Sequence, residues 1–292
     1  MRAWLLGLSL LLGVSGVDAS PLWVELDGLR ADLTPSQLDP EAMREAQRLF
    51  ADLAALTPSG EEPADLDERA ARFGLSVQRP EHGEWLALSP SVPGAEGFYV
   101  FRLSQVASPL VLQAPHAWYD LRTGRLGCLL FEEGAGQILM TNSGQRYAAE
   151  HADLAHQADT LFQAATQGVS QGLQDPLILQ LHGFGSSTSR RAAVVSPGSA
   201  LYDPAELAEI REGLDALFRG RIGSGDEVPD LAGRTNAQGV VLSSHVRFLH
   251  LELSSKARKS LVADADLRAE LAALVLRWAD AERGSWRRVG QP

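Results

Sequence analysis

The sequence predicts an α/β fold: a mostly parallel or mixed central sheet with helices on both faces, preceded by a small N-terminal α+β layer. From Pro109 onward, short β-rich apolar runs alternate with amphipathic segments of helical periodicity. Polar side chains stand at the ends of several runs, where sheets of this class bind their ligands. The chain has 292 residues, 45% of them hydrophobic, which is enough to bury a sizeable core.

Residues 1–19 have the pattern of a secretory signal peptide. One arginine precedes an apolar core from Ala3 to Val14, and small residues around Ala19 form a cleavage site. The apolar core is shorter than the roughly 20 residues of a spanning helix, so removal is favoured over anchoring. We therefore expect a protein without a membrane span in its mature chain, exported to the periplasm or the extracellular space.

Composition narrows the classes of partner. The single cysteine, Cys128, excludes an intramolecular disulfide, so the core must supply the stability. The net charge is −11, and the sequence has no cluster of lysine and arginine dense enough to contact a phosphate backbone. Nucleic acid is therefore not an expected partner. A peptide or a small-molecule substrate is expected instead.

Residues 20–104 predict an accessory α+β region without a cluster of chemically active side chains. An extended entry segment is expected over 20–37. Apolar spacing then predicts a helix that ends at Pro58 and a second helix that ends at Gly74. A hairpin with its tip at 81–83 and a strand in "GFYVFRLS" complete this region.

Residues 105–292 predict the α/β domain that carries the chemistry. The expected strands are "LVLQA" before His116, "QILMTN" ending at Asn142, "LILQL" before His182, "AAVVS" at 192–196 and "RFLHLEL" at 247–253. Helices are expected over 149–167, 203–219 and 264–282. The Gly/Asp-rich segment 221–239 is expected to be a long loop, and such loops often bind ligands.

The segment "LHGFGSS", which begins at Leu181, allows two kinds of chemistry. A strand followed by His-Gly-Phe-Gly is similar to the oxyanion loop of α/β-type serine hydrolases. That mechanism also needs a G-x-S-x-G elbow downstream, and the sequence has none. Alternatively, His182 is a metal ligand at a strand end.

The metal interpretation needs three side chains that converge on one ion. His116 follows a strand, Asp120 lies four residues later and can return to the same ion through a turn, and His182 ends another strand. Two imidazoles favour Zn²⁺ over the harder Ca²⁺ and Mg²⁺. The pattern indicates one zinc ion.

Glu252 lies in the middle of an apolar strand, where a carboxylate must be paired, hydrogen-bonded or near a metal. Alternation places it on the same face as Phe248 and His250. It is a candidate general base for a metal-activated water. The alternative is an exposed side chain on an edge strand.

Further polar residues are candidates for substrate binding. Arg146 can clamp a carboxylate or stabilise an oxyanion, with Asn142 beside it. Asn236 and Gln238, just before the last strand, can line the pocket. Asp153 and His156 are candidates for a supporting pair or a second metal site.

The order His116, Asp120, Asn142 with Arg146, His182 and Glu252 resembles the zinc carboxypeptidase superfamily, with its aspartoacylase, succinylglutamate desuccinylase, N-formylglutamate amidohydrolase and poly-γ-glutamate hydrolase branches. The likeness spans roughly residues 105 to 285. It implies an His/acidic pair and a later His on zinc, an Asn/Arg pair on the substrate and a late strand Glu that activates water. The family pair is usually His-x-x-Glu, whereas this chain has His-x-x-x-Asp, so Glu132 or Glu133 can replace Asp120 as the ligand.

These observations favour an exported zinc-dependent hydrolase of an amide bond next to a carboxylate, in a peptide, an N-acyl amino acid or a cell-wall fragment. His116, Asp120 and His182 are the expected ligands, Glu252 is the base and Arg146 orients the substrate. Two other classes stay open: a serine hydrolase that uses the HGFG segment, and a non-catalytic exported binding protein.

Overall fold

The computed structural model describes most of the chain after the expected signal peptide. The described residues are 20–31, 35, 37–56, 61–80, 84–92, 95–103, 109–198, 204–240, 242 and 246–280. The predicted signal peptide, residues 1–19, and the hairpin tip at 81–83 lie outside them. Within the described residues, no helix combines the length and the apolar character needed to cross a membrane.

The described strands form one mixed sheet of nine strands in the order β1-β2-β3-β5-β4-β6-β9-β7-β8. Their bounds are β1 Leu75–Gln78, β2 Trp85–Pro90, β3 Phe98–Arg102, β4 Leu110–Ala114, β5 Ile138–Thr141, β6 Leu177–Phe184, β7 Ala193–Ser196, β8 Ile222–Ser224 and β9 Arg247–Ser254. The four central strands β5, β4, β6 and β9 run parallel, and antiparallel strands flank them on both sides. The predicted α/β class with a mixed sheet is confirmed.

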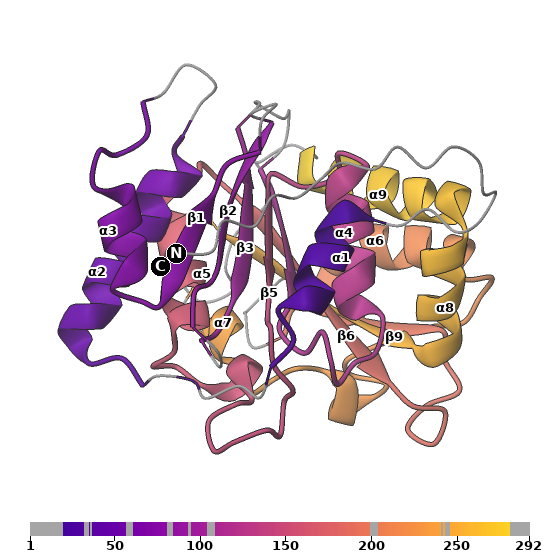
Figure 1. Ribbon diagram of the computed structural model, residues 1–292. Helices are drawn as coiled ribbons and strands as arrows, with labels where there is room; N and C mark the ends of the chain where they lie inside the picture. Colours follow the sequence, from indigo (N-terminus) through magenta and orange to yellow (C-terminus); the bar gives the residue numbers. More distant parts are fainter. Residues whose placement is uncertain are drawn as a thin grey trace, which may run out of the picture.

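Helices cover both faces of this sheet (Figure 1). One face carries α1 Pro21–Gly28, α4 Thr123–Glu132, α6 Pro204–Leu217, α8 Ser255–Ala263 and α9 Ala265–Asp280, and the other carries α2 Pro40–Ala54, α3 Leu66–Ala71, α5 Leu161–Gly172 and α7 Ala237–Val240. The strands alternate between the two cores, because successive side chains of a strand point to opposite faces. In β9, for example, Leu249, Leu251 and Leu253 join the first core, whereas Phe248 joins the second.

The region 20–104 shares the sheet with the rest of the chain, because β3 pairs with β5 along its length. Two expectations for secondary structure are wrong. Residues 21–28 form a helix rather than an extended entry, with Ser20 accepting a hydrogen bond from the Trp23 N–H at its N-terminus. The helix expected over 149–167 is replaced by turns, a short 3₁₀ helix over Leu154–His156 and α5.

The expected loop 221–239 is partly ordered into β8 and α7, and α4 and α8 were not predicted. The helices expected over 203–219 and 264–282 correspond to α6 and α9. Helix α5 packs closely on α2 because Gly168 has no Cβ: one there would meet the main-chain oxygen of Gln47.

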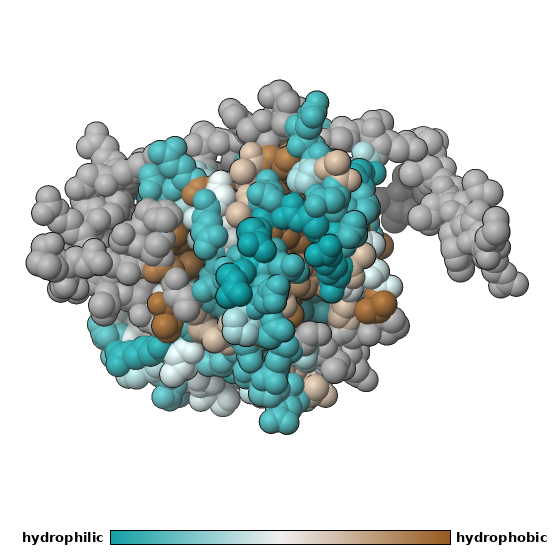
Figure 2. All heavy atoms as spheres, turned by 90° about the vertical axis from the view of Figure 1, so that its left-hand side faces the viewer, coloured by the Kyte–Doolittle hydropathy of each residue, from teal (hydrophilic) through white to brown (hydrophobic). Residues whose placement is uncertain are grey.

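The outer face of α2 and α3 is largely hydrophilic in the space-filling view (Figure 2). Its side chains pair across and along the helices, for example Arg69 with Asp52 and Arg72 with Glu68, at 2.8 and 3.0 Å between nitrogen and oxygen. Pairs this exposed contribute little stability. This layer covers one flank of the sheet (Figure 1).

Glu96 is a buried carboxylate whose titration should make stability depend on pH. Its Oε1 accepts a hydrogen bond of 2.6 Å from the Phe162 N–H at the start of α5, while its Oε2 has no partner. Burial raises the pKa of Glu96 to about 8, although the hydrogen bonds from the α5 main chain lower it. Between the ordinary pKa near 4.5 and about 8, the folded protein keeps a proton that the unfolded chain releases.

We therefore expect the contribution of Glu96 to the free energy of unfolding to fall as pH rises from about 4.5 to 8, by up to roughly 1.4 kcal/mol per pH unit. Glu96→Gln keeps an acceptor for Phe162 and removes this dependence. Urea unfolding of both proteins between pH 5 and 8.5 measures it. Parallel curves for the two proteins would contradict the assignment.

Candidate functional site

Polar side chains gather at the carboxyl ends of β4, β6 and β9, on the face that carries α5. The strand register sets two rows: Gln113, Gln180 and His250 lie side by side in one, and His182 and Glu252 in the next. Towards the other end of the strands, the same face is apolar, with Val111, Ile178 and Phe248 in the core. The parallel pairing thus brings residues that are distant in sequence to one edge of the sheet.

The segment after β4 turns back on itself and brings Asp120 beside His116. The Asp120 N–H donates a hydrogen bond of 2.8 Å to the His116 carbonyl, which closes one helical turn. Both side chains are buried, with exposed fractions of 0% for His116 and 4% for Asp120. The predicted spacing therefore produces the predicted turn.

Three ligand atoms of His116, Asp120 and His182 lie within 4.8 Å of one another. The Asp120 Oδ2 is 3.5 Å from His116 Nδ1 and 3.3 Å from His182 Nδ1, and the two rings stand edge to face with centroids 5.0 Å apart. The structure thus brings together the three residues that the sequence analysis named as ligands.

Both imidazoles of this cluster use Nε2 for a hydrogen bond on the side away from Asp120. His116 Nε2 is 2.8 Å from Asp153 Oδ1, and His182 Nε2 is 2.8 Å from Gln180 Oε1. Since these oxygens only accept, each Nε2 carries the proton of the neutral ring and each Nδ1 carries a lone pair. In these neutral tautomers two Nδ1 lone pairs face the Asp120 oxygen, an arrangement that a cation satisfies. A ring that carries a second proton would instead donate it from Nδ1 to Asp120 Oδ2, at 3.3 Å for His182 and 3.5 Å for His116.

The carboxylate of Asp120 stays ionised in this cluster. Burial raises the pKa of Asp120, but the imidazoles of His116 and His182 outweigh that effect and hold the pKa well below its usual range. Burial lowers the pKa of His182, which keeps that ring neutral. Burial also lowers the pKa of His116, but its hydrogen bonds with Asp120 and Asp153 outweigh that effect and raise it. Metal binding requires the neutral form of both rings, so an ion would displace any second proton on His116.

Asp153 connects His116 to Arg146. Its Oδ2 accepts from Arg146 Nε at 2.8 Å and from a terminal guanidinium nitrogen at 2.7 Å, and its Oδ1 also lies 3.0 Å from His156 Nδ1. Burial raises the pKa of Asp153, but the hydrogen bonds from His116 and His156 outweigh that effect and lower it strongly. Asp153 therefore bonds to His116 on the side away from Asp120, and His156 contacts Asp153.

Arg146 lies between the buried cluster and the surface. Its side chain is 22% exposed, and its guanidinium carbon lies 5.7 Å from the ring centroid of Tyr119 and 5.3 Å from that of Tyr147. These two tyrosines meet edge to face at 4.9 Å and are exposed at 46% and 64%. A positive group framed by two exposed aromatic rings suits a ligand with a carboxylate.

Glu252 points to the same face of β9 as predicted, opposite the leucines of the first core. Strand β9 lies inside the sheet between β6 and β7, so the edge-strand alternative is wrong. Burial and then the nearby charge of Asp120 raise the pKa of Glu252 to about 8, and its Oε2 has no hydrogen-bond partner. The side chain is therefore free to bond to a ligand beside His182.

His182, His250 and Glu252 form a second group of possible ligand atoms. However, the rings of His182 and His250 stack at 4.5 Å with an angle of 29° between their planes. Because the lone pair of an imidazole nitrogen lies in the ring plane, stacked rings do not direct their lone pairs at one ion. His250, which also packs against Gly233, is better described as a wall of the site.

The alternative ligands Glu132 and Glu133 lie elsewhere. Glu132 accepts a hydrogen bond of 2.9 Å from the Leu22 N–H, and Glu133 forms an ion pair with Arg268. The oxyanion-loop interpretation is also wrong, because His182, Gly183 and Phe184 lie within β6 and pair with β9 up to Ser254. The chain leaves the sheet only after Phe184.

Three residues predicted to bind substrate have other contacts. Asn142 is buried and hydrogen-bonds within its own turn, to the Gly144 N–H and carbonyl at 3.3 Å. Asn236 and Gln238 are also buried, and both hydrogen-bond to Gln180 behind His182. Asn236 and Gln238 therefore contact Gln180 rather than line an open pocket, and Asn142 bonds within its own turn rather than to Arg146.

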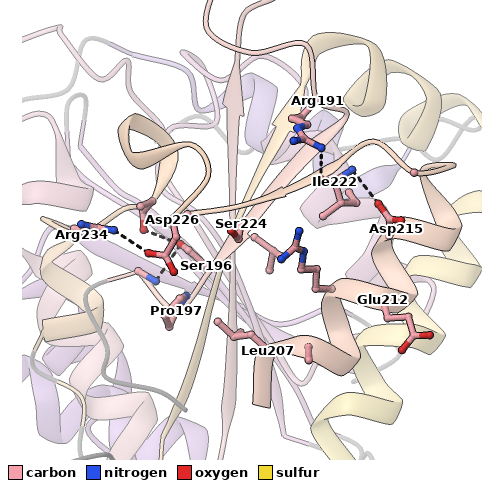
Figure 3. Close-up of a pocket in the computed structure, with 17 residues that line it drawn as sticks. Arg191, Ser196, Pro197, Leu207, Glu212, Asp215, Ile222, Ser224, Asp226 and Arg234 are labelled. Carbon is pink, nitrogen blue, oxygen red and sulfur yellow. Dashed lines mark hydrogen bonds and ion pairs between the residues drawn. The ribbon is translucent and has the colours of Figure 1, made fainter. Parts of the chain in front are cut away.

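A cavity lies away from this cluster, between β7, β8, α6 and the segment after β8 (Figure 3). Its volume is about 880 Å³, and none of the cluster residues lines it. Charged side chains at its border pair with one another, such as Arg234 with Asp226 at 3.0 Å and Arg191 with Glu227 at 3.2 Å. Because these charged groups are already paired, the volume of this cavity is not by itself evidence for a functional site.

Gln113 and Gln180 were not predicted as part of the site; they lie side by side on β4 and β6, in the row next to His182. A signal was present: each is the fourth residue of an otherwise apolar strand, "LVLQA" and "LILQL". A buried amide in such a strand must find partners on both its oxygen and its nitrogen.

No known protein family and no curated protein matches the chain. Among solved structures, the chain is similar to N-formylglutamate amidohydrolase from Ralstonia eutropha JMP134, with 15% identity, a TM-score of 0.42 and coverage of 64% of this chain and 97% of that one. A bacteriophage poly-γ-glutamate hydrolase has 14% identity, a TM-score of 0.37 and coverage of 60% and 87%. Succinylglutamate desuccinylase from Vibrio parahaemolyticus has 11% identity, a TM-score of 0.40 and coverage of 69% and 77%.

Proposed function

We propose that this protein is an exported zinc-dependent hydrolase that cleaves an amide bond next to a carboxylate. The observation that carries the proposal is the convergence of two imidazole lone pairs and one ionised carboxylate, with both rings held from behind by hydrogen-bond acceptors. Such acceptors accompany metal-binding histidines in proteins. Export rests on the signal-peptide pattern of residues 1–19.

His116, Asp120 and His182 would hold one ion, and three protein ligands are typical of catalytic zinc. Two nitrogen ligands and one oxygen suit this borderline ion better than calcium or magnesium. When bound, zinc supplies a Lewis acid that polarises a carbonyl and makes water acidic enough to attack at neutral pH. The cluster is nearly closed to solvent, which strengthens these charge effects.

Glu252 acts as the general base. It lies opposite His182 in the strand register, beside the ligand cluster, and its Oε2 has no partner. Because burial raises the pKa of this side chain to about 8, its ionised form becomes the main one only above that pH. In that form the carboxylate takes a proton from the attacking water and then delivers that proton to the departing amine. Breaking the C–N bond thus yields a carboxylate and an amine.

Arg146 binds the carboxylate of the substrate. Asp153 holds two of its nitrogens, and this contact orients the guanidinium rather than filling its hydrogen-bonding capacity, since the group has five donors. Tyr119 and Tyr147 border the same spot and offer apolar surface to the rest of the substrate. A peptide tail, an N-acyl amino acid or a cell-wall fragment meets these requirements.

Zinc titration of the wild-type protein, combined with a hydrolysis assay, tests the proposal. We expect about one equivalent of zinc per chain and release of amine from N-acyl amino acids that stops on removal of the ion by a chelator and returns on addition of zinc. Hydrolysis that resists chelation would contradict zinc dependence and favour a metal-free hydrolase. Zinc binding without any hydrolysis across a panel of N-acyl amino acids and short peptides would favour a binding protein.

Arg146→Met should lower kcat/KM for substrates with a free carboxylate by about 10- to 150-fold, because a charge-assisted pair with a guanidinium, worth roughly 1.5–3 kcal/mol, is lost. The same variant should change the hydrolysis of the matching carboxamide much less. Measuring both substrates separates substrate binding from the support that Arg146 gives to Asp153. An equal loss on both substrates would contradict a role in binding the carboxylate.

A further inference from the structure

A network of buried side-chain amides lies behind His182. Gln180 is its centre: its Nε2 donates to Gln113 Oε1 at 2.9 Å and to Gln238 Oε1 at 3.2 Å. Its Oε1 accepts from His182 Nε2 at 2.8 Å and from the Asn236 amide. Gln113, Gln180 and Gln238 are fully buried, so neither end of the Gln180 amide faces water.

The direction of each amide is fixed by main-chain groups whose roles cannot reverse. Gln238 Nε2 donates to the Leu154 carbonyl at 2.9 Å, so its oxygen must face Gln180. Asn236 Oδ1 accepts from the Gly239 N–H at 3.2 Å, so its nitrogen must face Gln180. Both anchors lead to the same orientation of the Gln180 amide.

A third anchor comes from α5. The Thr166 hydroxyl donates to the Phe162 carbonyl at 2.9 Å, and therefore accepts from Gln113 Nε2 at 2.9 Å. The Gln113 oxygen is then left to accept from Gln180. A reversed Gln180 amide would set its oxygen against two other oxygens, and buried acceptors facing one another are strongly unfavourable.

We propose that Gln180 is a positioning residue that holds the proton of His182 on Nε2 and so directs the Nδ1 lone pair toward Asp120. The role of the network is to make the ligand form of His182 the only one that satisfies every buried amide. This inference rests on the proposed function in one respect, the use of Nδ1 as a zinc ligand. The position of the proton is a property of the chain itself.

¹⁵N NMR of histidine-labelled protein tests the proton position directly, at pH 8 and with and without zinc. The wild-type signal of His182, assigned by its absence in His182→Ala, should show a proton on Nε2 that exchanges slowly with water in both samples. A wild-type His182 with its proton on Nδ1 and a bare Nε2 would overturn the inference. This reading needs no variant of Gln180 to fold.

Gln180→Met removes the acceptor and keeps the length of the side chain. We expect faster exchange of the Nε2 proton by at least about tenfold and zinc affinity lower by about 10- to 100-fold, as for other outer partners of metal-binding histidines. Gln113→Met is the matched control, since Gln238 and Asn236 still fix Gln180, and it should leave both readings unchanged. Equal effects of the two variants, or no effect of Gln180→Met, would contradict the role of Gln180.

The two proposals fail in different ways. A slowly exchanging Nε2 proton in a wild-type protein that does not bind zinc would leave the positioning role in place and reject the metal. Stoichiometric zinc together with a His182 that carries its proton on Nδ1 would support the metal and reject the positioning role.

Discussion

Glu252→Gln is expected to lower kcat by about 10³-fold while the protein still binds one zinc ion, because general acid–base groups contribute roughly 10²- to 10⁴-fold. The amide is nearly the same size as the carboxylate and cannot take a proton from water. Since Glu252 is not among the three ligand residues, KM for an N-acyl amino acid should change little. Steady-state kinetics together with zinc content measures both effects.

Glu96→Gln is the matched control for this experiment. Glu96, like Glu252, is a buried carboxylate whose pKa burial raises to about 8, and each has an oxygen without a hydrogen-bond partner. Glu96 precedes β3 and bonds to the start of α5 rather than to the cluster, so its replacement should leave kcat near the wild-type value. Equal activity of Glu252→Gln and wild type would remove Glu252 from the mechanism.

The central strands could be predicted because they are apolar on both faces, as sheets covered by two helical layers require. The cluster could be predicted because parallel neighbours share a carboxyl end. β4 and β6 are adjacent, so residues after Ala114 and near the end of β6 meet although 62 positions separate Asp120 from His182. The position of each histidine at or after the end of a parallel strand therefore predicts that the two lie close together.

The helices were harder to predict where tertiary contacts override local pattern. The segment 149–160 has helical spacing, yet Asp153 bonds to His116, Arg146 and His156, and these contacts hold it in turns. Helix α5 then begins after Thr160, whose side chain accepts from the Gln163 N–H. None of these partners is visible within a local window of sequence.

The role of the amides was missed for a related reason. Asn236 and Gln238 lie in a Gly/Asp-rich segment that suggests a ligand-binding loop, but this segment folds inward as α7. Their partner Gln180 comes from a strand 56 positions away in the case of Asn236. A polar side chain in a loop-like segment therefore does not reveal whether it faces a substrate or another buried amide.

His182→Ala is expected to abolish stoichiometric zinc binding and, with it, hydrolysis above the level of the metal-free protein. The change removes one of three ligand atoms and leaves Asp120 beside a single imidazole, so the loss of affinity should exceed the 10- to 100-fold typical of outer partners. Metal analysis after dialysis, with a competing chelator of known affinity, measures the change.

His151→Ala is the control for this change, because His151 is a partly buried histidine whose Nδ1 lies 3.3 Å from Gln157 Oε1 rather than in the cluster. It should bind zinc like the wild-type protein. If His182→Ala kept a full equivalent of zinc, the ion would lie elsewhere in the protein. Zinc would then not be the cation held by His116 and His182. If His182→Ala loses zinc and His151→Ala does not, the ion lies between β4 and β6. An ion held there by three protein ligands keeps an open position, at which it can activate water.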